Sequence, residues 1–338
     1  MIKVPVGRLV EVRNLTKYFP VQKGLIRKTV GYVRAVDGVD LVIDARETVG
    51  LVGESGCGKS TLGRTLLRLY EPTSGEILFY DNGTRYSIAE LRSAEMRRLR
   101  AKMQIIFQDP FSSLNERMTV MDNILEPLVV SRVGTRAERI ERAAELVQRV
   151  GLRPQDLRSY PHSFSGGQRQ RIGIARALAP DPKFIVADEP VSALDVSIQA
   201  HILELIKRLK NEFDLTILFI SHDLGVVRYV SDRIAVMYLG KIVEIAPRDE
   251  LLAEPKHPYT EALLSAVPKP DPDHQVKRII LKGDIPDQMH RPEGCVFYGR
   301  CIYGDSSCAT TRQHLAATKG NHFVACHMHE SLKLRGVN

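Results

Sequence analysis

The sequence lacks long hydrophobic runs, internal repeats and low-complexity tracts, and these absences exclude several classes of protein. No segment of its 338 residues approaches the roughly 18 consecutive apolar residues of a membrane-spanning helix. The N-terminal sequence MIKVPVGRLVEV contains no apolar block of the kind found in secretory signals. Hydrophobic residues make up 43% of the chain and charged residues 26%, which excludes disordered, collagen-like and coiled-coil proteins. We therefore expect a soluble, globular protein of the cytosol.

The charge balance is mildly basic, with 48 Lys and Arg against 40 Asp and Glu, a net charge of +8. This balance suits nucleic acid, anionic lipid or a polyphosphate ligand, and by itself does not choose among them. The arginine-rich run at 92–102 is interrupted by Glu95 and has no aromatic residue nearby. We interpret it as the solvated face of a helix, and we expect no nucleic-acid partner.

The spacing of apolar residues predicts an α/β fold. Short β-type runs alternate with glycine turns up to about residue 83, and residues 84–180 are rich in Arg and Glu with apolar residues at helical spacing. The β/α pattern returns at 181–250, which favours a mainly parallel sheet covered by helices. Residues 251–294 are rich in proline and predict a connector to a small cysteine-bearing tail.

The strongest motif is GESGCGKST at residues 53–61, named here the phosphate loop. It follows the apolar run 49–52 and precedes the helical stretch 62–69, which is the strand, loop and helix order that this motif requires. Its glycines allow backbone N–H groups to point into one concavity, and the helix N-terminus adds a positive dipole end. The motif therefore predicts a nucleotide site.

Within the phosphate loop, Lys59 is expected to neutralise β- and γ-phosphate oxygens, Ser60 to bind Mg²⁺, and Thr61 to contact the phosphates nearest the sugar. Cys57 is interpreted as a small filler inside the loop. The candidate nucleotide-binding residues of the loop are Gly53, Glu54, Ser55, Gly56, Cys57, Gly58, Lys59, Ser60 and Thr61.

A second motif, FIVADE at 184–189, is a buried-type strand that ends in two carboxylates. Asp188 is suited to bind Mg²⁺, and Glu189, one residue further on, can polarise an attacking water. By itself, a strand that ends in two carboxylates is a common pattern. It becomes a specific signal when it lies about 130 residues after a phosphate loop. We expect Glu189 to act in catalysis and Asp188 to hold the metal.

A third motif, FSGGQRQR at 164–171, places two glycines at the start of a helical stretch and so offers a second anion-binding helix N-terminus. One nucleotide does not need two such cradles from one chain. We therefore expect this signature motif to serve the nucleotide of a partner subunit. Its candidate residues are Ser165, Gly166, Gly167 and Gln168.

Over residues 8–250 the chain resembles the ATPase subunits of ABC transporters, with six motifs in the family's order. Besides the three motifs above, Gln108 in IIFQDP corresponds to the family's Q-loop, Asp195 in SALD to its D-loop and His222 in FISHD to its switch histidine. Phe19 in LTKYFP corresponds best to the adenine-stacking aromatic residue, and Tyr18 is the alternative.

The resemblance implies a P-loop NTPase domain at 1–250, with an antiparallel β subdomain at the N-terminus and a helical signature subdomain at about 84–180. It also implies two ATPase subunits paired head to tail. Each ATP then lies between catalytic residues of one subunit and the signature motif of the other. The implied catalytic residues are Lys59, Gln108, Glu189 and His222, and the implied Mg²⁺ ligands are Ser60, Gln108 and Asp188.

Three further segments are similar to ATPase subunits of dipeptide and oligopeptide importers: VQKGLIRKTVGYVRAVDGV, FQDPFSSLNERMTV and KHPYTEALLSAVP. Glu116 stands where that subfamily usually has proline. The resemblance implies two transmembrane permease subunits, a second ATPase that is identical or a paralogue, and an extracytoplasmic solute-binding protein as an indirect partner. It implies a location at the cytoplasmic face of the membrane.

Four of the five cysteines lie near the end of the chain, in the predicted C-terminal extension 251–338: Cys295, Cys301, Cys308 and Cys326. In a reducing cytosol such a cluster favours a metal or iron–sulfur site over disulfides. Zinc sites favour cysteine pairs two to four residues apart, and none occurs here. The wider gaps suit a cubane, and the resemblance implies a [4Fe–4S] cluster in some members of the subfamily. Zinc, or no metal, remains the alternative.

Other functions remain open from the sequence. The same ATPase role could serve an oligosaccharide or nickel importer, because specificity lies in the permeases and the binding protein. A soluble ABC ATPase of translation or DNA repair usually carries two motif sets or a long coiled coil, and this chain has one set. A metal-sensing regulator built on the cysteine tail would not need both Glu189 and His222.

Overall fold

The computed structural model describes residues 7–24, 28–267, 278–283, 286–289, 291–318 and 320–337. Parts of the proline-rich connector predicted at 251–294 therefore lie outside the described residues. The chain forms two compact units. The first unit comprises the described residues within 1–10, 43–48 and 78–220, and the second those within 11–42, 49–77 and 221–338. The predicted division of the chain at residue 250 stays a prediction.

The first unit contains three parallel strands in the order β8-β7-β6. They are β6 (Met103–Ile106), β7 (Phe184–Asp188) and β8 (Thr216–Ile220). Every residue of β7 and β8 is buried, which explains why both strands appear in the sequence as continuous apolar runs rather than alternating ones. Helix α7 (Val196–Glu212) lies between β7 and β8 in the chain and has one buried face.

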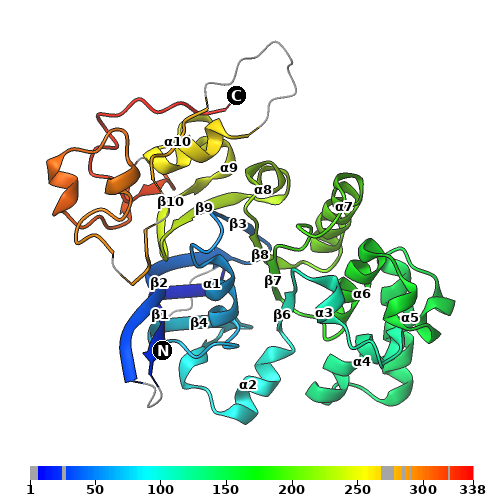
Figure 1. Ribbon diagram of the computed structural model, residues 1–338. Helices are drawn as coiled ribbons and strands as arrows, with labels where there is room; N and C mark the ends of the chain where they lie inside the picture. Colours follow the sequence, from blue (N-terminus) through cyan, green and yellow to red (C-terminus); the bar gives the residue numbers. More distant parts are fainter. Residues whose placement is uncertain are drawn as a thin grey trace. The chain divides into compact units, whose positions relative to one another are not determined.

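Several helices of the first unit gather in one group (Figure 1). Helix α5 illustrates how the sequence sets their limits: Thr135 and Glu138 form a capping box at its start, and Gly151 with φ 78° follows its end. The group consists of α3 (Pro110–Ser113), α4 (Val120–Ser131), α5 (Arg136–Arg149) and α6 (Gly166–Leu178), and α2 (Ser93–Arg100) lies to one side of it.

The N-terminal part of the chain forms a four-stranded sheet in the order β2-β1-β4-β5. Its strands are β1 (Arg8–Lys23), β2 (Lys28–Asp44), β4 (Ser74–Asp81) and β5 (Thr84–Ser87). Strands β4 and β5 pair antiparallel. Together with the parallel strands this confirms the predicted α/β class with an antiparallel β subdomain near the N-terminus.

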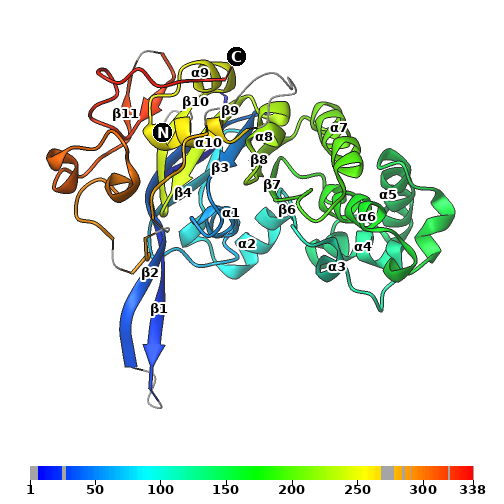
Figure 2. The same ribbon diagram turned by 45° about the horizontal axis from the view of Figure 1, so that its top comes forward.

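In the second unit β3 pairs parallel with β9, and β9 then pairs antiparallel with β10. The short strand β12 adds to β10, and β11 adds to β12, so the C-terminal residues extend this sheet beside β10 (Figure 2). The strands are β3 (Thr48–Val52), β9 (Arg233–Tyr238), β10 (Lys241–Pro247), β11 (Ala316–Ala317) and β12 (Phe323–Val324). The helices are α1 (Lys59–Leu66), α8 (Leu224–Val230), α9 (Arg248–Ala253) and α10 (Pro258–Ser265).

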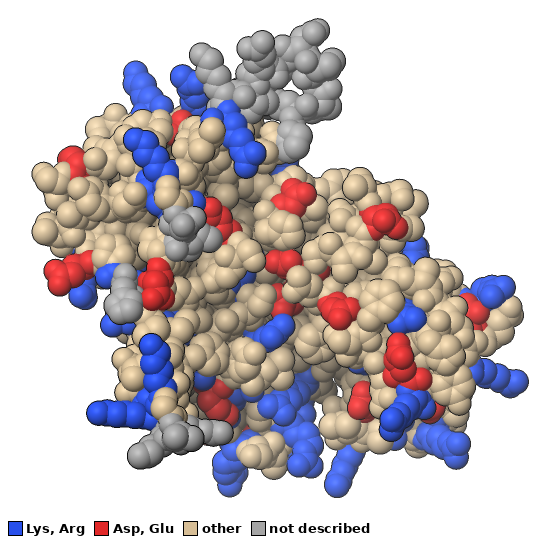
Figure 3. All heavy atoms as spheres, in the orientation of Figure 1, with Lys and Arg blue, Asp and Glu red and all other residues tan. Residues whose placement is uncertain are grey.

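Helix α2 carries the arginine-rich run predicted to be a solvated helix face. Met96 and Leu99 are its buried residues, whereas the arginines around them are exposed. Figure 3, in the orientation of Figure 1, shows basic side chains near α2 at the lower edge of this face. Among the described residues, no helix combines the length and apolar character needed to cross a membrane.

Candidate functional site

The phosphate loop lies between β3 and α1, as the sequence predicts. A Cβ atom at Gly58, where φ is 111°, would stand 2.0 Å from the carbonyl oxygen of Ala35, so this position requires glycine. The buried Lys59 side chain donates from Nζ to the carbonyl oxygens of Gly53 (2.8 Å) and Glu54 (3.0 Å). The loop therefore wraps around the lysine at the N-terminus of α1, where first-turn N–H groups lack intrahelical partners. This arrangement fits a polyphosphate.

His222 belongs to the same unit as the phosphate loop. Its neighbour Ser221 donates its backbone N–H to the carbonyl oxygen of Leu51 (3.1 Å), in the strand that leads into the loop. Asp223, on the other side, caps α8 by accepting the N–H of Gly225 (2.7 Å). The predicted switch histidine is thus held between two anchored neighbours at the end of β3.

Gln108 and Glu189 meet in the first unit. Strands β6 and β7 run parallel, and Ile106 lies opposite Ala187, so both chains leave the sheet at the same edge. Gln108 Nε2 donates to Glu189 Oε2 at 3.1 Å. Two residues predicted separately, from motifs 81 positions apart, therefore form one contact. Asp188, the last residue of β7, is fully buried beside them in the chain.

The backbone of Glu189 has a conformation that is uncommon for a residue other than glycine. Its φ is 46°, in the left-handed region. Its N–H donates to the carbonyl oxygen of Ile220 (3.0 Å), and its own carbonyl oxygen accepts from Ser192 Oγ (3.1 Å). Such strain persists where the surrounding structure holds it, and it is frequent at functional sites.

The signature motif begins α6. Ser165 Oγ accepts the N–H of Gln168 (3.4 Å), and Gln168 Oε1 accepts the N–H of Ser165 (3.0 Å), which is a capping box. A Cβ atom at Gly167 would stand 2.6 Å from a side-chain carbon of Ile198, at the start of α7. Glycine is therefore needed for packing against the segment that follows Asp195. The serine hydroxyl hydrogen is not used by the cap, so it can be donated to an anion.

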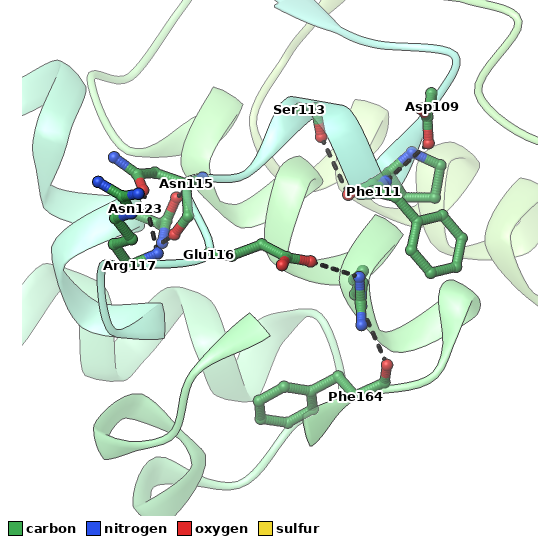
Figure 4. A network of polar contacts seen from close by, with 10 residues as sticks. Asp109, Phe111, Ser113, Asn115, Glu116, Arg117, Asn123 and Phe164 are labelled. Carbon is green, nitrogen blue, oxygen red and sulfur yellow. Dashed lines mark hydrogen bonds and ion pairs between the residues drawn. The ribbon is translucent and has the colours of Figure 1, made fainter. Parts of the chain in front are cut away.

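Side chains of α6 also hold the segment that follows Gln108 (Figure 4). Arg169 forms an ion pair with Glu116 (3.1 Å) and donates to the carbonyl oxygen of Phe164 (3.1 Å). Its guanidinium carbon lies 4.4 Å from the centroid of the Phe111 ring. Arg176, further along the helix, donates to the carbonyl oxygen of Ser113 (2.5 Å). Helix α6 therefore connects the signature motif to the residues after Gln108. Glu116 acts here as the ion-pair partner of Arg169.

The two candidate adenine-stacking residues have different surroundings. The ring of Phe19 packs edge-on against Tyr70 (centroids 5.5 Å apart), and Lys17 Nζ lies 4.8 Å from its centroid. Tyr18 donates from its hydroxyl to Asp37 (2.5 Å), and burial with this contact raises the pKa of Tyr18 to about 12. Because the Tyr18 side chain is engaged by Asp37, Phe19 remains our prediction for the adenine contact.

The four C-terminal cysteines line one cavity, named here the cysteine cavity: Cys295, Cys301, Cys308 and Cys326. All are free thiols. Cys295 N–H donates to the carbonyl oxygen of Cys308 (2.8 Å), which ties two of the cysteine segments together. Burial raises the pKa of Cys326 to about 11, so this thiol is neutral at neutral pH when no cation is near. Four thiols facing one cavity are a donor set that fits an iron–sulfur cluster or zinc.

His257 also lines the cysteine cavity, but its hydrogen bonding argues against a ligand role. Its Nδ1 accepts the backbone N–H of Tyr259 (3.1 Å), and burial lowers the pKa of His257 to about 3. The ring is therefore neutral, and its hydrogen bond assigns the proton to Nε2. We interpret it as a helix-capping histidine of the core.

Within the described residues, three side chains of the C-terminal part of the second unit contact the phosphate loop, and the sequence motifs do not reveal them: Tyr259, Gln288 and Arg300. The sequence separations are 205, 232 and 246 residues. No local pattern signals contacts of such range, and only the fold could reveal them.

The family description "ABC transporter" matches residues 36–192, and "Oligopeptide/dipeptide transporter, C-terminal region" matches residues 243–308. The chain is 51% identical over 324 residues to the oligopeptide transport ATP-binding protein AppF of Bacillus subtilis, covering 95% of this chain and 97% of AppF. It is 52% identical over 318 residues to a putative peptide import ATP-binding protein of Brucella ovis, covering 94% of this chain and 97% of that protein.

Among solved structures, the chain resembles a dimeric post-hydrolysis state of the ATP-binding cassette MJ0796 bound to ADP and Pi. The TM-score is 0.61 at 31% identity, covering 71% of this chain and 99% of that one. Fold, site and relatives together define an ABC ATPase. The chain belongs to the ABC transporter family, in its oligopeptide/dipeptide branch, as the motif order predicted.

Proposed function

We propose that the chain is the ATP-hydrolysing subunit of a peptide importer, bound at the cytoplasmic face of the membrane. It would work with two transmembrane permease subunits, a second ATPase subunit and, indirectly, an extracytoplasmic solute-binding protein. The observation that carries this proposal is the match of residues 243–308 to the oligopeptide/dipeptide transporter C-terminal region, beside an ABC ATPase domain.

The proposed site residues divide the work of hydrolysis. The phosphate loop binds the β- and γ-phosphates, with Lys59 balancing their charge, and Phe19 stacks on the adenine. Glu189 takes the proton of the attacking water, and its contact with Gln108 orients the carboxylate toward that water. His222 donates a hydrogen bond to the γ-phosphate.

Ser60, Gln108 and Asp188 are the proposed holders of Mg²⁺, which supplies charge neutralisation on the phosphoryl oxygens when bound. Buried Asp188 and the hydroxyl of Ser60 are the oxygen ligands that this ion prefers. The signature residues Ser165, Gly166, Gly167 and Gln168, with Asp195 near them, would act on the nucleotide of the second ATPase. Closure around ATP and reopening after hydrolysis would drive the permeases through the Gln108 segment.

We expect the chain to co-purify with its two permeases and second ATPase, and the reconstituted complex to hydrolyse ATP faster when peptide-loaded binding protein is added. The measurement is phosphate release in proteoliposomes with di- to pentapeptides, oligosaccharides and nickel as separate solutes. Stimulation by an oligosaccharide or nickel alone would replace the peptide assignment. Failure to associate with any membrane subunit would favour a soluble ABC ATPase.

We further propose that the cysteine cavity holds a [4Fe–4S] cluster with a structural role. Support comes from the four free thiols on one cavity and from the sparse apolar sequence around them. Segments this small usually need a disulfide bond or a bound metal to stay folded. A zinc ion is the alternative, and Asp305, Cys308 and His327 lie close enough to share one. The carboxylate of Asp305, however, already caps a turn by accepting from Ser307 and Cys308.

Protein purified without oxygen is expected to be brown and to contain iron and sulfide in equal amounts. Cys301→Ser should remove the colour and loosen residues 291–318, because one of four ligands is lost, while ATP is still bound, at reduced affinity. Cys57→Ser, at the buried cysteine outside the cavity, is the matched control and should stay coloured. Colourless wild-type protein with one zinc per chain would contradict the cluster, but it would agree with the argument that this segment needs a bound metal to stay folded.

A further inference from the structure

Where the structure describes it, the C-terminal part of the second unit contacts the phosphate loop through three side chains. Tyr259 accepts the backbone N–H of Glu54 on its hydroxyl (2.8 Å), and Gln288 Nε2 donates to the carbonyl oxygen of Gly56 (2.5 Å). Arg300 forms two hydrogen bonds to the carboxylate of Glu54, at 2.6 and 3.0 Å. The loop is therefore held from outside the strand and helix that it connects.

The contact between Arg300 and Glu54 is the strongest of the three. A guanidinium that meets a carboxylate through two parallel hydrogen bonds fixes both distance and orientation. The Arg300 side chain is 8% exposed and that of Glu54 is 24% exposed. Removing one partner of so enclosed a pair leaves the other charge poorly compensated.

Arg300 is placed by the segment that forms the cysteine cavity. It directly precedes Cys301 and ends the turn Tyr298–Arg300, in which its N–H donates to the carbonyl oxygen of Phe297 (3.0 Å). The Phe297 ring packs against Tyr238 and Tyr259, with centroids 5.2 and 5.4 Å away. The position of the guanidinium thus depends on the fold of the turn Tyr298–Arg300 together with Cys301 that follows it, named here the cysteine-bearing turn.

The charge of Glu54 explains why its position matters. A carboxylate in a loop that binds polyphosphate repels the ligand unless a cation neutralises it. Lys59 Nζ is directed to the carbonyl oxygens of Gly53 and Glu54. Arg300 supplies the missing positive charge for Glu54 and holds its side chain in one orientation.

We propose that Arg300 is a positioning residue for the nucleotide site, through which the folded state of the cysteine-bearing turn sets the affinity for ATP. When the turn is intact, Arg300 neutralises Glu54 and the phosphate loop keeps the conformation described above. When the turn loosens, Glu54 is released and ATP binds less tightly. This inference rests on the proposed nucleotide site at 53–61.

The first test is a double-mutant cycle on the full chain, with the Kd of MgATP measured by titration with a fluorescent ATP analogue. Arg300→Met is expected to raise Kd about 10-fold, a typical size for coupling between two sites. In the Arg300→Met background, Glu54→Gln is expected to restore affinity because no uncompensated carboxylate remains, and the single variant Glu54→Gln completes the cycle. Arg312→Met is the matched control, since that exposed arginine of the same segment contacts the carbonyl oxygen of Glu293 instead.

Unchanged Kd in Arg300→Met, or no restoration by Glu54→Gln, would overturn the proposal. Lys59→Ala separates this failure from a wrong nucleotide site: if Lys59→Ala also binds ATP normally, the site at 53–61 is itself wrong. A global loss of fold would lower the melting temperature of Arg300→Met and would not be reversed by the second substitution.

The second test addresses the cysteine-bearing turn. Cys301→Ser is expected to raise the Kd of MgATP in the wild-type background and to have no further effect in Arg300→Met. Equal effects of Cys301→Ser in both backgrounds would show that the turn acts on the nucleotide site without Arg300, and would overturn the proposed route.

Discussion

Glu189→Gln is expected to lower ATP hydrolysis by about 10²–10⁴-fold, the range for loss of a positioned general base. The substitution keeps the size of the side chain and an oxygen that can accept the hydrogen bond from Gln108 Nε2. The backbone at φ 46° and its bond to Ile220 are not altered. What is lost is the basicity that takes a proton from the attacking water.

The measurements are steady-state phosphate release and the Kd of MgATP. Binding should remain near the wild-type value, and the ATP-bound closed pair should accumulate because it can no longer be emptied by hydrolysis. Glu141→Gln, at an exposed position of α5, controls for loss of a carboxylate as such. Hydrolysis at the wild-type rate in Glu189→Gln would show that this residue is not the base.

The sequence predicted best those parts of the site that local patterns encode. The phosphate loop is recognisable because its glycines, lysine and serine must stand at fixed spacings between a strand and a helix, and the structure has β3 and α1 on either side. The strand β7 was predictable because its run of apolar residues is buried throughout and ends in Asp188. The capping residues and Gly151 mark the limits of α5 for the same local reasons.

The remaining features depend on contacts between distant segments. The pairs Arg300–Glu54 and Arg169–Glu116 join positions 246 and 53 residues apart, and no periodicity announces them. Ile140 fits the helical apolar spacing, yet it is 38% exposed, because spacing alone does not determine how far a buried face extends. The left-handed backbone at Glu189 is likewise imposed by its neighbours rather than by its residue type.

Ser165→Asp is expected to lower ATP turnover by about 100-fold or more, which is the effect of removing one hydrogen-bond donor to a charged reacting group. Aspartate can still accept the N–H of Gln168, so the helix cap that Ser165 provides is kept. It replaces a hydroxyl donor with a negative charge at the position that should face the γ-phosphate of the partner subunit's ATP. The repulsion arises only when the two subunits close, so ATP affinity of the isolated chain should hardly change.

Ser165→Asn is the matched control, because it caps the helix and has the shape of aspartate without its charge. We expect it to keep far more turnover than Ser165→Asp, with melting temperatures of both variants close to wild type. An ATP affinity that falls in Ser165→Asp as much as in Lys59→Ala would mean that the signature motif serves the nucleotide of its own chain. In a preparation where the chain pairs with itself, mixing Ser165→Asp with Lys59→Ala protomers should recover activity. One of the two sites then combines an intact phosphate loop with an intact signature motif, which is possible only if the two halves come from different subunits.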